Sequence, residues 1–536
     1  MTPPPYRDLV QSYLDLRWQL DPVAATQAGV RAHDARLGEY GRPQIKVALA
    51  ALKSMAAAFE YCEPDTLAEE VDQTAVLNDL RATIARFEKE KPQERSAEFH
   101  VSHLFSGLFA LLLRPDEPPE SRARALIGRL KATPRFLRDA RDTLKRPARV
   151  FTETALAVAE GGKALFGEAM DEIGSRVAPQ TREALREAVG EARTALEEFI
   201  AFAGGELLDR SAADFAIGSK QFDFRLHYEH ALRESAPELL RFGEALVRTQ
   251  EAELARRAEA LAPGVPWREL VTRLRRDHPP REALVAAYAA AMERARRFVA
   301  EHDLMTIPAG TLEVVATPPF MEPLIPFAAY DPPGAFGEGH TGWFYVSVPE
   351  DERLREHSVH ELATTALHEG YPGHHVQFLA AQAQPSPVRK VVGTALSLEG
   401  WALYCEQLMG EEGFYARPEE AFFQQMHMLW RAIRVVLDVR LQTCGMTVEE
   451  AVRYLMEMLD LARPSAEAEV RRYCCNPGNA LCYAVGSREM MRLREDWRRR
   501  AGSAFSLKKF HDEVLTYGGL PISLMRWGMG LGESEK

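Results

Sequence analysis

A helical periodicity that runs almost without interruption from Tyr6 to about Asp303 constrains this chain more than any other feature. Apolar residues recur there at three- and four-residue spacing, within long segments rich in Ala, Leu, Arg and Glu. We see no internal repeat with a period of roughly 20 to 50 residues, so the pattern favours a helical bundle over a solenoid. We expect the helices to break at Pro118-Pro119, Pro134, Pro179, Pro263-Gly264 and Pro279-Pro280.

The sequence changes character between Thr306 and Pro349. Two segments rich in β-branched and aromatic residues, 312–317 and 341–348, predict strands. The Pro- and Gly-rich stretch between them, which contains Tyr330-Asp331-Pro332-Pro333-Gly334, is typical of a loop. We therefore expect a small sheet, which is either an edge over a substrate cleft or a hairpin that only caps the bundle.

Helical periodicity resumes after the predicted sheet, and we expect helices over 395–410, 418–444, 447–461 and 479–500. The second of these has an apolar and aromatic stripe that we assign to the core: Phe422, Phe423, Met426, Leu429, Trp430, Ile433 and Leu437. The predicted fold class is mainly α, a large helical body with a small β-sheet next to a catalytic helix pair. We expect a helical N-terminal region over 1–303 and a second region over 304–536 that carries the sheet and the C-terminal helices.

A cluster of potential metal ligands lies within 368–375, where the sequence is His-Glu-Gly-Tyr-Pro-Gly-His-His. Imidazole and carboxylate groups are common zinc ligands, and Glu399 follows a short helix later. The bland alternative is a helix end with partly buried imidazoles. Three His and one Glu within eight residues, beside Pro and Gly that disrupt a helix, favour a metal site.

The spacing of the histidines is unusual for a zinc motif. His374 is six residues after His368, which on an unbroken helix places the two rings about 240° apart. Pro372 lacks the N–H that would bond the His368 carbonyl, so we expect a bulge there. If the bulge absorbs two residues, His374 takes the position of an i+4 ligand. The alternative is His375, which on an unbroken helix would lie about 10 Å along the axis from His368, too far for the two rings to share a metal easily.

Segments 368–375 and 398–406, the latter Leu-Glu-Gly-Trp-Ala-Leu-Tyr-Cys-Glu, resemble the bacterial DUF885 family, which is regarded as a family of zinc metallopeptidases related to the gluzincins. The motif of the family has the form HExxxGH. Residues 344–346, 476–480 with Tyr483 and Gly486, 510–511 and 519–521 are also similar to the family, so the resemblance covers most of the chain.

The resemblance implies a zinc-dependent metallopeptidase with a gluzincin-like site. His368, His374 and Glu399 would bind Zn²⁺ and leave a fourth position for water, as in catalytic rather than structural zinc sites. Glu369 would act as general base toward the metal-activated water, and Tyr483 would donate a hydrogen bond to the oxyanion. Glu406, seven residues after Glu399, could accept the second N–H of a ligand histidine.

Composition limits the partners of the protein. A formal net charge of -12 opposes nucleic acid or an anionic membrane as the main partner, and 46% hydrophobic with 27% charged residues is ordinary for a globular protein. The longest apolar run, 99–113, contains His100, Ser102 and His103 and is shorter than the ~20 residues of a membrane span. We expect a peptide substrate, with no nucleic acid and no membrane.

The N-terminal residues and the cysteines predict a cytoplasmic location. Residues 1–8 show no basic segment followed by an apolar one, and six irregularly spaced cysteines do not suggest a disulfide framework. Two other functions remain open on the sequence alone. A zinc hydrolase of a non-peptide amide or ester would use the same residues, and a catalytically silent helical binding protein could have the same fold.

Overall fold

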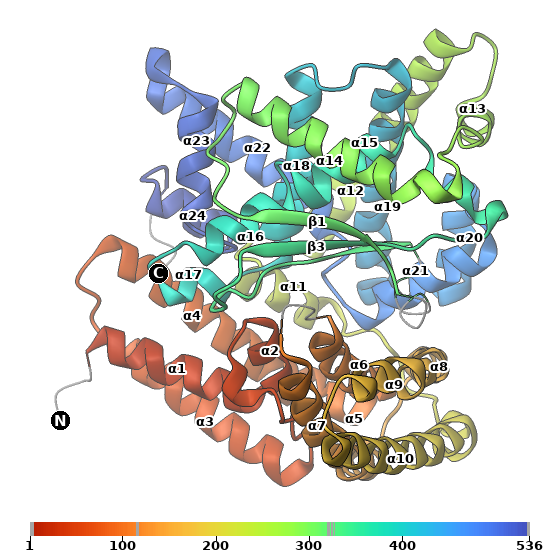
Figure 1. The fold of residues 1–536 in the computed structure, drawn as a ribbon. Helices are drawn as coiled ribbons and strands as arrows, with labels where there is room; N and C mark the ends of the chain where they lie inside the picture. Colours follow the sequence, from red (N-terminus) through yellow and green to blue (C-terminus); the bar gives the residue numbers. More distant parts are fainter. Residues whose placement is uncertain (1–4, 114–116, 319–321, 323–324, 326, 533–536) are drawn as a thin grey trace.

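The computed structural model of the protein describes residues 5–113, 117–318, 322, 325 and 327–532. Of the N-terminal residues 1–8, on which the predicted location depends, residues 1–4 lie outside this part. Helices dominate, and a three-stranded sheet lies between two groups of them (Figure 1). The predicted fold class, mainly α with a small β-sheet, is confirmed. Among the described residues, no helix combines the length and the apolar character that crossing a bilayer requires.

The helices of the first part of the chain form the lower group in Figure 1. Their bounds are α1 (Tyr6–Leu20), α2 (Pro22–Gln27), α3 (Arg42–Glu60), α4 (Leu67–Ala85), α5 (Pro92–Arg95), α6 (Ala97–Leu112), α7 (Pro119–Thr143), α8 (Arg149–Gly162), α9 (Glu168–Ser175) and α10 (Pro179–Phe202).

Helix α7 corrects one predicted break. It continues through Pro134, although this residue has no N–H to donate to the carbonyl of Leu130. Leu130 and Leu137, one turn on either side of the proline, are both buried against the helices around them. The packing of both halves of the helix therefore outweighs the lost hydrogen bond.

The remaining helices form the upper group and the link to it. They are α11 (Ser219–Tyr228), α12 (Ala236–Leu261), α13 (Trp267–Leu274), α14 (Leu284–Glu301), α15 (Leu362–Thr365), α16 (His374–Gln382), α17 (Pro387–Val391), α18 (Ala395–Glu411), α19 (Pro418–Thr443), α20 (Val448–Leu459), α21 (Arg463–Cys475), α22 (Cys482–Ala501), α23 (Leu507–Leu515) and α24 (Ile522–Gly528). The helices expected near 395, 418 and 447 are confirmed. The fourth begins at Cys482, not at residue 479, and α21 was not predicted.

Hydrophobic cores join segments on both sides of residue 303. One core contains Tyr13 and Phe59 of the N-terminal helices together with Trp401, Tyr404 and Phe510. Another contains residues of α12 and the predicted apolar stripe of α19, which is buried as expected. The division into 1–303 and 304–536 stays a prediction, and the two parts share cores where they meet.

The sheet has the strand order β1-β3-β2. Strand β1 (Thr311–Ala316) pairs in parallel with β3 (Thr341–Val346), so these two segments are not a hairpin. Strand β2 (Ala328–Asp331) is antiparallel to β3 and occupies part of the stretch predicted as a loop. The prediction missed β2 because Pro332-Pro333-Gly334 follows it directly and dominates the local composition.

The two faces of the sheet contact different parts of the protein. Phe344 and Val346 pack into a core with Tyr288 of α14 and Ala366, which lies two residues before His368. On the opposite face, Trp343 and Tyr345 line a cavity of about 240 Å³ whose far side includes α6. The sheet therefore supports the segment that carries the predicted metal ligands.

Candidate metal centre

The chain around His368 is broken rather than simply bulged. Helix α15 continues into a π-helical turn, η8 (Ala366–Gly370), after which Tyr371, Pro372 and Gly373 leave the helix and α16 begins at His374. The Tyr371–Pro372 peptide bond is cis. A Cβ atom on Gly373 would collide with the carbonyl oxygens of Leu367 and His368, so only glycine allows the chain to pass so close to the turn.

This break brings the two histidines together. The ring centres of His368 and His374 are 4.9 Å apart, and the rings are nearly perpendicular. Glu399 on α18 completes the group, because its Oε2 lies 3.3 Å from His368 Nε2 and 3.5 Å from His374 Nε2. Possible ligand atoms of all three residues lie within 4.8 Å of one another, and this is the one such group of three or more found in the described part of the chain.

The Glu399 carboxylate fits a metal better than it fits a hydrogen bond. Its Oε2 is buried and makes no hydrogen bond to any described residue, although two imidazole nitrogens are close. A buried carboxylate oxygen without a partner is costly, and a cation would remove that cost. Two imidazoles and one carboxylate are a donor set typical of catalytic zinc.

Glu406 orients the first histidine. His368 Nδ1 lies 2.8 Å from Glu406 Oε1, and the Glu406 side chain is fully buried. Nδ1 of His368 donates this hydrogen bond to the carboxylate oxygen, so Nε2 is the ring nitrogen that faces Glu399 and is left for a metal. The expected role of Glu406 as the acceptor for a candidate ligand histidine is therefore present in the structure.

The pKa values of His368 and Glu399 also indicate a place for a cation. Burial lowers the pKa of His368, but the neighbouring carboxylates of Glu399 and Glu406 outweigh it and raise the pKa to about 10. Burial alone would raise the pKa of Glu399, yet the two histidines hold it well below the usual range. Without a metal, a proton is thus attracted to the place that a cation would occupy.

His375 lies apart from this group. Its Nδ1 is 3.0 Å from the Tyr330 hydroxyl of β2, and its ring packs edge-on against Tyr371. The side chain is completely buried, and burial lowers its pKa to about 4. The structure thus brings His374, and not the adjacent His375, to His368 and Glu399.

Glu369 and Tyr483, the two predicted catalytic residues, are both available for chemistry. Glu369 follows His368 on the π-helical turn, is partly exposed, and has no hydrogen bond or ion pair with a described residue. Tyr483 is in the first turn of α22, and its ring lies parallel to that of His368 with 6.2 Å between centres. Burial and the Glu399 charge raise the pKa of Tyr483 to about 12, so its hydroxyl keeps its proton near neutral pH.

A close crossing of two helices fixes the positions of Glu399 and Tyr483 relative to each other. Helices α18 and α22 meet at Gly400 and Gly486, where a Cβ on Gly400 would come within 2.5 Å of the Gly486 backbone. Gly400 directly follows Glu399, and Gly486 is three residues after Tyr483. The contact between two glycines therefore fixes the distance between a candidate ligand and the candidate oxyanion donor.

Sequence reasoning missed a polar stripe on α19. Gln424, His427, Arg431 and Arg434 recur at three- and four-residue spacing opposite the apolar stripe of the same helix. Arg431 and Arg434 lie over the Tyr483 ring, with their guanidinium carbons 5.7 and 4.7 Å from its centre. The signal was available in the sequence, because four polar side chains on one face of an otherwise buried helix are unusual.

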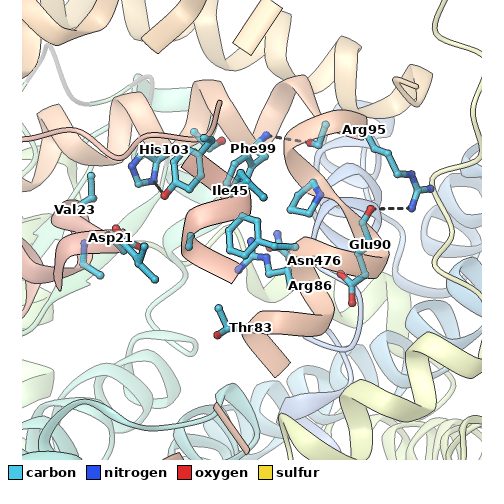
Figure 2. A pocket seen from close by; sticks show the side chains of 18 of the residues that line it. Asp21, Val23, Ile45, Thr83, Arg86, Glu90, Arg95, Phe99, His103 and Asn476 are labelled. Atoms are coloured by element: carbon cyan, nitrogen blue, oxygen red, sulfur yellow. Dashed lines mark hydrogen bonds between the residues drawn. The ribbon is translucent and has the colours of Figure 1, made fainter. Parts of the chain in front are cut away.

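A cavity of about 530 Å³ lies between the N-terminal helices and the loop that follows α21. Its lining includes the charged residues Arg86 and Glu90 and the aromatic ring of Phe99 (Figure 2). Residues 476 and 477, from a segment that resembles the family in sequence, also line it, together with residues 215 and 217. His368, His374 and Glu399 do not, so this cavity is separate from the candidate metal centre.

Comparison with known proteins identifies the fold and the family. The structure is similar to that of a proposed lipoprotein of unknown function from Shewanella oneidensis, with a TM-score of 0.81 and 23% identity over 98% of this chain and 100% of the other. A proposed lipoprotein from Colwellia psychrerythraea has a TM-score of 0.85 and 20% identity, over 98% of both chains. No curated protein matches the chain. Residues 22–529 match a family described as bacterial protein of unknown function, and the chain therefore belongs to this family, DUF885.

Proposed function

We propose that the protein is a zinc-dependent metallopeptidase. The observation that carries the proposal is the convergence of His368, His374 and Glu399, whose donor atoms lie within 4.8 Å of one another around a buried carboxylate oxygen that has no hydrogen bond. These three residues would hold the metal, and Glu406 would keep Nε2 of His368 free to bind it. Bound zinc supplies a Lewis acid and makes water a stronger nucleophile near neutral pH.

The residues of the chain provide the proton transfers that amide hydrolysis needs. Glu369, which is free of other partners, takes a proton from the attacking water and passes it to the nitrogen of the leaving amine. The water oxygen forms the new C–O bond as the C–N bond breaks, so the products are a carboxylic acid and an amine. The Tyr483 hydroxyl, protonated at neutral pH, donates a hydrogen bond to the oxygen on which negative charge develops.

The test combines metal analysis with peptide digestion. Full-length protein is incubated with zinc, freed of excess metal and assayed for bound metal; we expect about one zinc per chain. The same protein is then given a mixture of peptides, and the products are identified by mass spectrometry. Protein that binds no zinc by calorimetry would contradict the proposal. Cleavage of amide or ester test compounds without cleavage of any peptide would favour the non-peptide hydrolase instead.

The proposed location is the cytoplasm. The six cysteines are all free and four of them are buried, which suits a reducing compartment. The two similar structures belong to proteins described as proposed lipoproteins, which favours the cell envelope. Fractionation of the native host decides between the two, since recovery in the membrane fraction would overturn the cytoplasmic assignment.

A further inference from the structure

Arg431 is a largely buried cation near the candidate metal centre whose guanidinium group forms no ion pair with a described residue. Its Nε is buried and makes no hydrogen bond, and no hydrogen bond or ion pair joins its guanidinium group to a described residue. The guanidinium carbon lies 5.7 Å from the centre of the Tyr483 ring, and the carboxylates of Glu406 and Glu399 act on its charge from farther away, without an ion pair. Buried charges in proteins are normally paired, so an arginine left in this state indicates a place for an anion from outside the chain.

Glu469 on α21 is already engaged by arginines other than Arg431. Arg434 donates to Glu469 at 3.0 Å and to the Tyr473 hydroxyl at 3.1 Å, and Arg472 donates to the same Glu469 at 2.8 Å. Glu469 therefore pairs with two other arginines and forms no ion pair with Arg431.

Two further carboxylates of this region pair with other residues, although Oε2 of Glu406 makes no hydrogen bond. Glu361 pairs with Arg275 at 3.1 Å and with His427 at 3.2 Å, while Glu406 accepts the proton of His368. The carboxylates that act on the charge of Arg431, those of Glu406 and Glu399, belong to the candidate metal centre, and neither forms an ion pair with Arg431 in the described part of the chain.

The position of Arg431 suits a group attached to a bound peptide. Tyr483 contacts both the His368 ring, 6.2 Å away, and the Arg431 guanidinium, 5.7 Å away. The His368 ring centre and the Arg431 guanidinium carbon are thus at most about 12 Å apart, the span of about three to four extended residues at about 3.4 Å each. A substrate whose scissile bond lies at the metal centre can place a nearby carboxylate on Arg431.

We propose that Arg431 binds the C-terminal carboxylate of the peptide substrate, so that the enzyme removes a short C-terminal fragment of one to three residues. This inference rests on the proposed peptidase function and adds exopeptidase specificity to it. Guanidinium and carboxylate groups match in geometry and form paired hydrogen bonds, which a neutral peptide amide cannot reproduce. An acidic side chain close to the scissile bond presents the same chemistry, and the test separates the two sources.

The test uses zinc-loaded full-length protein and three forms of one cleaved peptide. The first has a free C-terminal acid, the second a C-terminal amide, and the third a free acid with every Asp and Glu in its last three positions replaced by Asn and Gln. The variants are Arg431→Met, which keeps most of the apolar stem, and Arg431→Lys, which keeps the charge. Arg440→Met is the matched control, since Arg440 lies on the same helix but pairs with Glu244 away from the site.

We expect wild-type protein to cleave both free-acid peptides with a kcat/KM about tenfold to a hundredfold above that of the amide, as for the loss of a charged hydrogen bond. Arg431→Met should lower kcat/KM for the acids to the amide level and leave the amide unchanged. Arg431→Lys should restore part of the difference, and Arg440→Met should behave as wild type.

Four results would overturn the inference. Wild-type protein could cleave the acid and the amide at equal rates, or Arg431→Met could lose activity toward both equally with zinc still bound. Either result would show that Arg431 does not bind the terminal carboxylate, while the proposed peptidase function would stand. If kcat/KM depends on the acidic side chains and not on the C-terminal carboxylate, Arg431 binds a side chain, and the proposed removal of a C-terminal fragment is refuted. Cleavage of none of the peptides by any variant would overturn both this inference and the proposed function.

Discussion

At the scale of single residues, the two adjacent histidines of the motif differ most clearly. His374 faces His368 and Glu399, whereas His375 faces Tyr330 on the sheet. We expect His374→Ala to lower zinc affinity by at least about a hundredfold, the upper range for residues that only support a ligand. His375→Ala should leave the affinity nearly unchanged. Competition of each variant with a zinc chelator measures the effect, and loss of zinc from His375→Ala alone would refute the ligand set.

Glu369 carries the proton transfer in the proposed mechanism and contributes no ligand. Glu369→Gln keeps the volume of the side chain but removes the basic oxygen, so we expect kcat to fall by about 10² to 10⁴ while the zinc content stays at the wild-type level. Elemental analysis and initial rates on one protein batch measure both quantities. Activity near that of wild type would take the general-base role away from Glu369.

The ring and the hydroxyl of Tyr483 have different roles: the ring packs against the site, and the hydroxyl is the proposed hydrogen-bond donor to the oxyanion. The ring stacks on His368, and the guanidinium groups of Arg431 and Arg434 lie over it. The hydroxyl makes no hydrogen bond to a described residue. Tyr483→Phe keeps the ring, so we expect a fall in kcat of about tenfold or more with unchanged zinc affinity. An unchanged kcat would mean that Tyr483 only packs against the site.

The residues of the centre could be selected from the sequence, but their environment could not. The donor types and the proline in the motif pointed to His368, His374 and Glu399, and the seven-residue spacing pointed to Glu406. Arg431 was overlooked because the meaning of its charge depends on Glu361 and Glu469, which pair with other residues. Such pairing is a property of the packed protein and leaves no local trace in the sequence.

At the scale of elements, the site depends on the contact between α18 and α22. Gly486→Ala would place a methyl group against the Leu396 carbonyl and within 2.7 Å of Gly400 Cα, so the helices must separate. We expect a loss of about 1–3 kcal/mol in the free energy of unfolding and weaker zinc binding, because Glu399 moves with α18. Urea denaturation of the metal-free protein and chelator competition measure the two effects.

Gly190→Ala is the control for this substitution. Gly190 lies inside α10 with nothing within 4 Å of an added Cβ, so helix propensity alone should stabilise the protein, by up to about 1 kcal/mol. Unchanged stability and unchanged zinc affinity in Gly486→Ala would show that the helix crossing does not position the centre.

The elements that periodicity defines were predictable, and those that depend on distant partners were not. Helices α18, α19 and α20 follow their sequence patterns closely. Strand β2 exists because its backbone pairs with β3, and α7 passes through Pro134 because its two halves pack against neighbouring helices. In both cases the local composition favoured a loop or a break, and tertiary contacts decided otherwise.

At the scale of the whole molecule, buried neutral histidines are distributed across the fold. His100 is on α6, His357 lies next to the sheet and His511 is on α23; all are at most 1% exposed. Burial lowers the pKa of each to about 4, against about 6.5 in an unfolded chain. Between pH 6.5 and about pH 4, these histidines are therefore protonated in the unfolded chain but neutral in the folded protein.

The stability that these histidines provide is complete above pH 6.5 and is lost as the pH falls from 6.5 toward 4. The loss is on the order of 2 kcal/mol for each histidine by pH 5. Carboxylates with lowered pKa act in the same direction only at still lower pH. Asp438, whose pKa burial raises to about 7, and His368, whose pKa is raised to about 10, act in the opposite direction between pH 7.5 and 5 and reduce the net loss. We expect metal-free protein in the presence of a chelator to become acid-sensitive throughout the fold.

His511 allows this expectation to be tested one residue at a time. Its ring accepts from the Tyr404 hydroxyl at 2.7 Å and donates to the Leu304 carbonyl at 2.7 Å, and glutamine can both accept and donate in the same place without titrating. The free energy lost in His511→Gln, measured against wild type by urea denaturation, should shrink by on the order of 2 kcal/mol between pH 7.5 and pH 5. Taking the difference between the two proteins cancels every other titrating group, including those of the metal centre. A difference that stays constant over this range would show that His511 binds its proton equally in the folded and unfolded states.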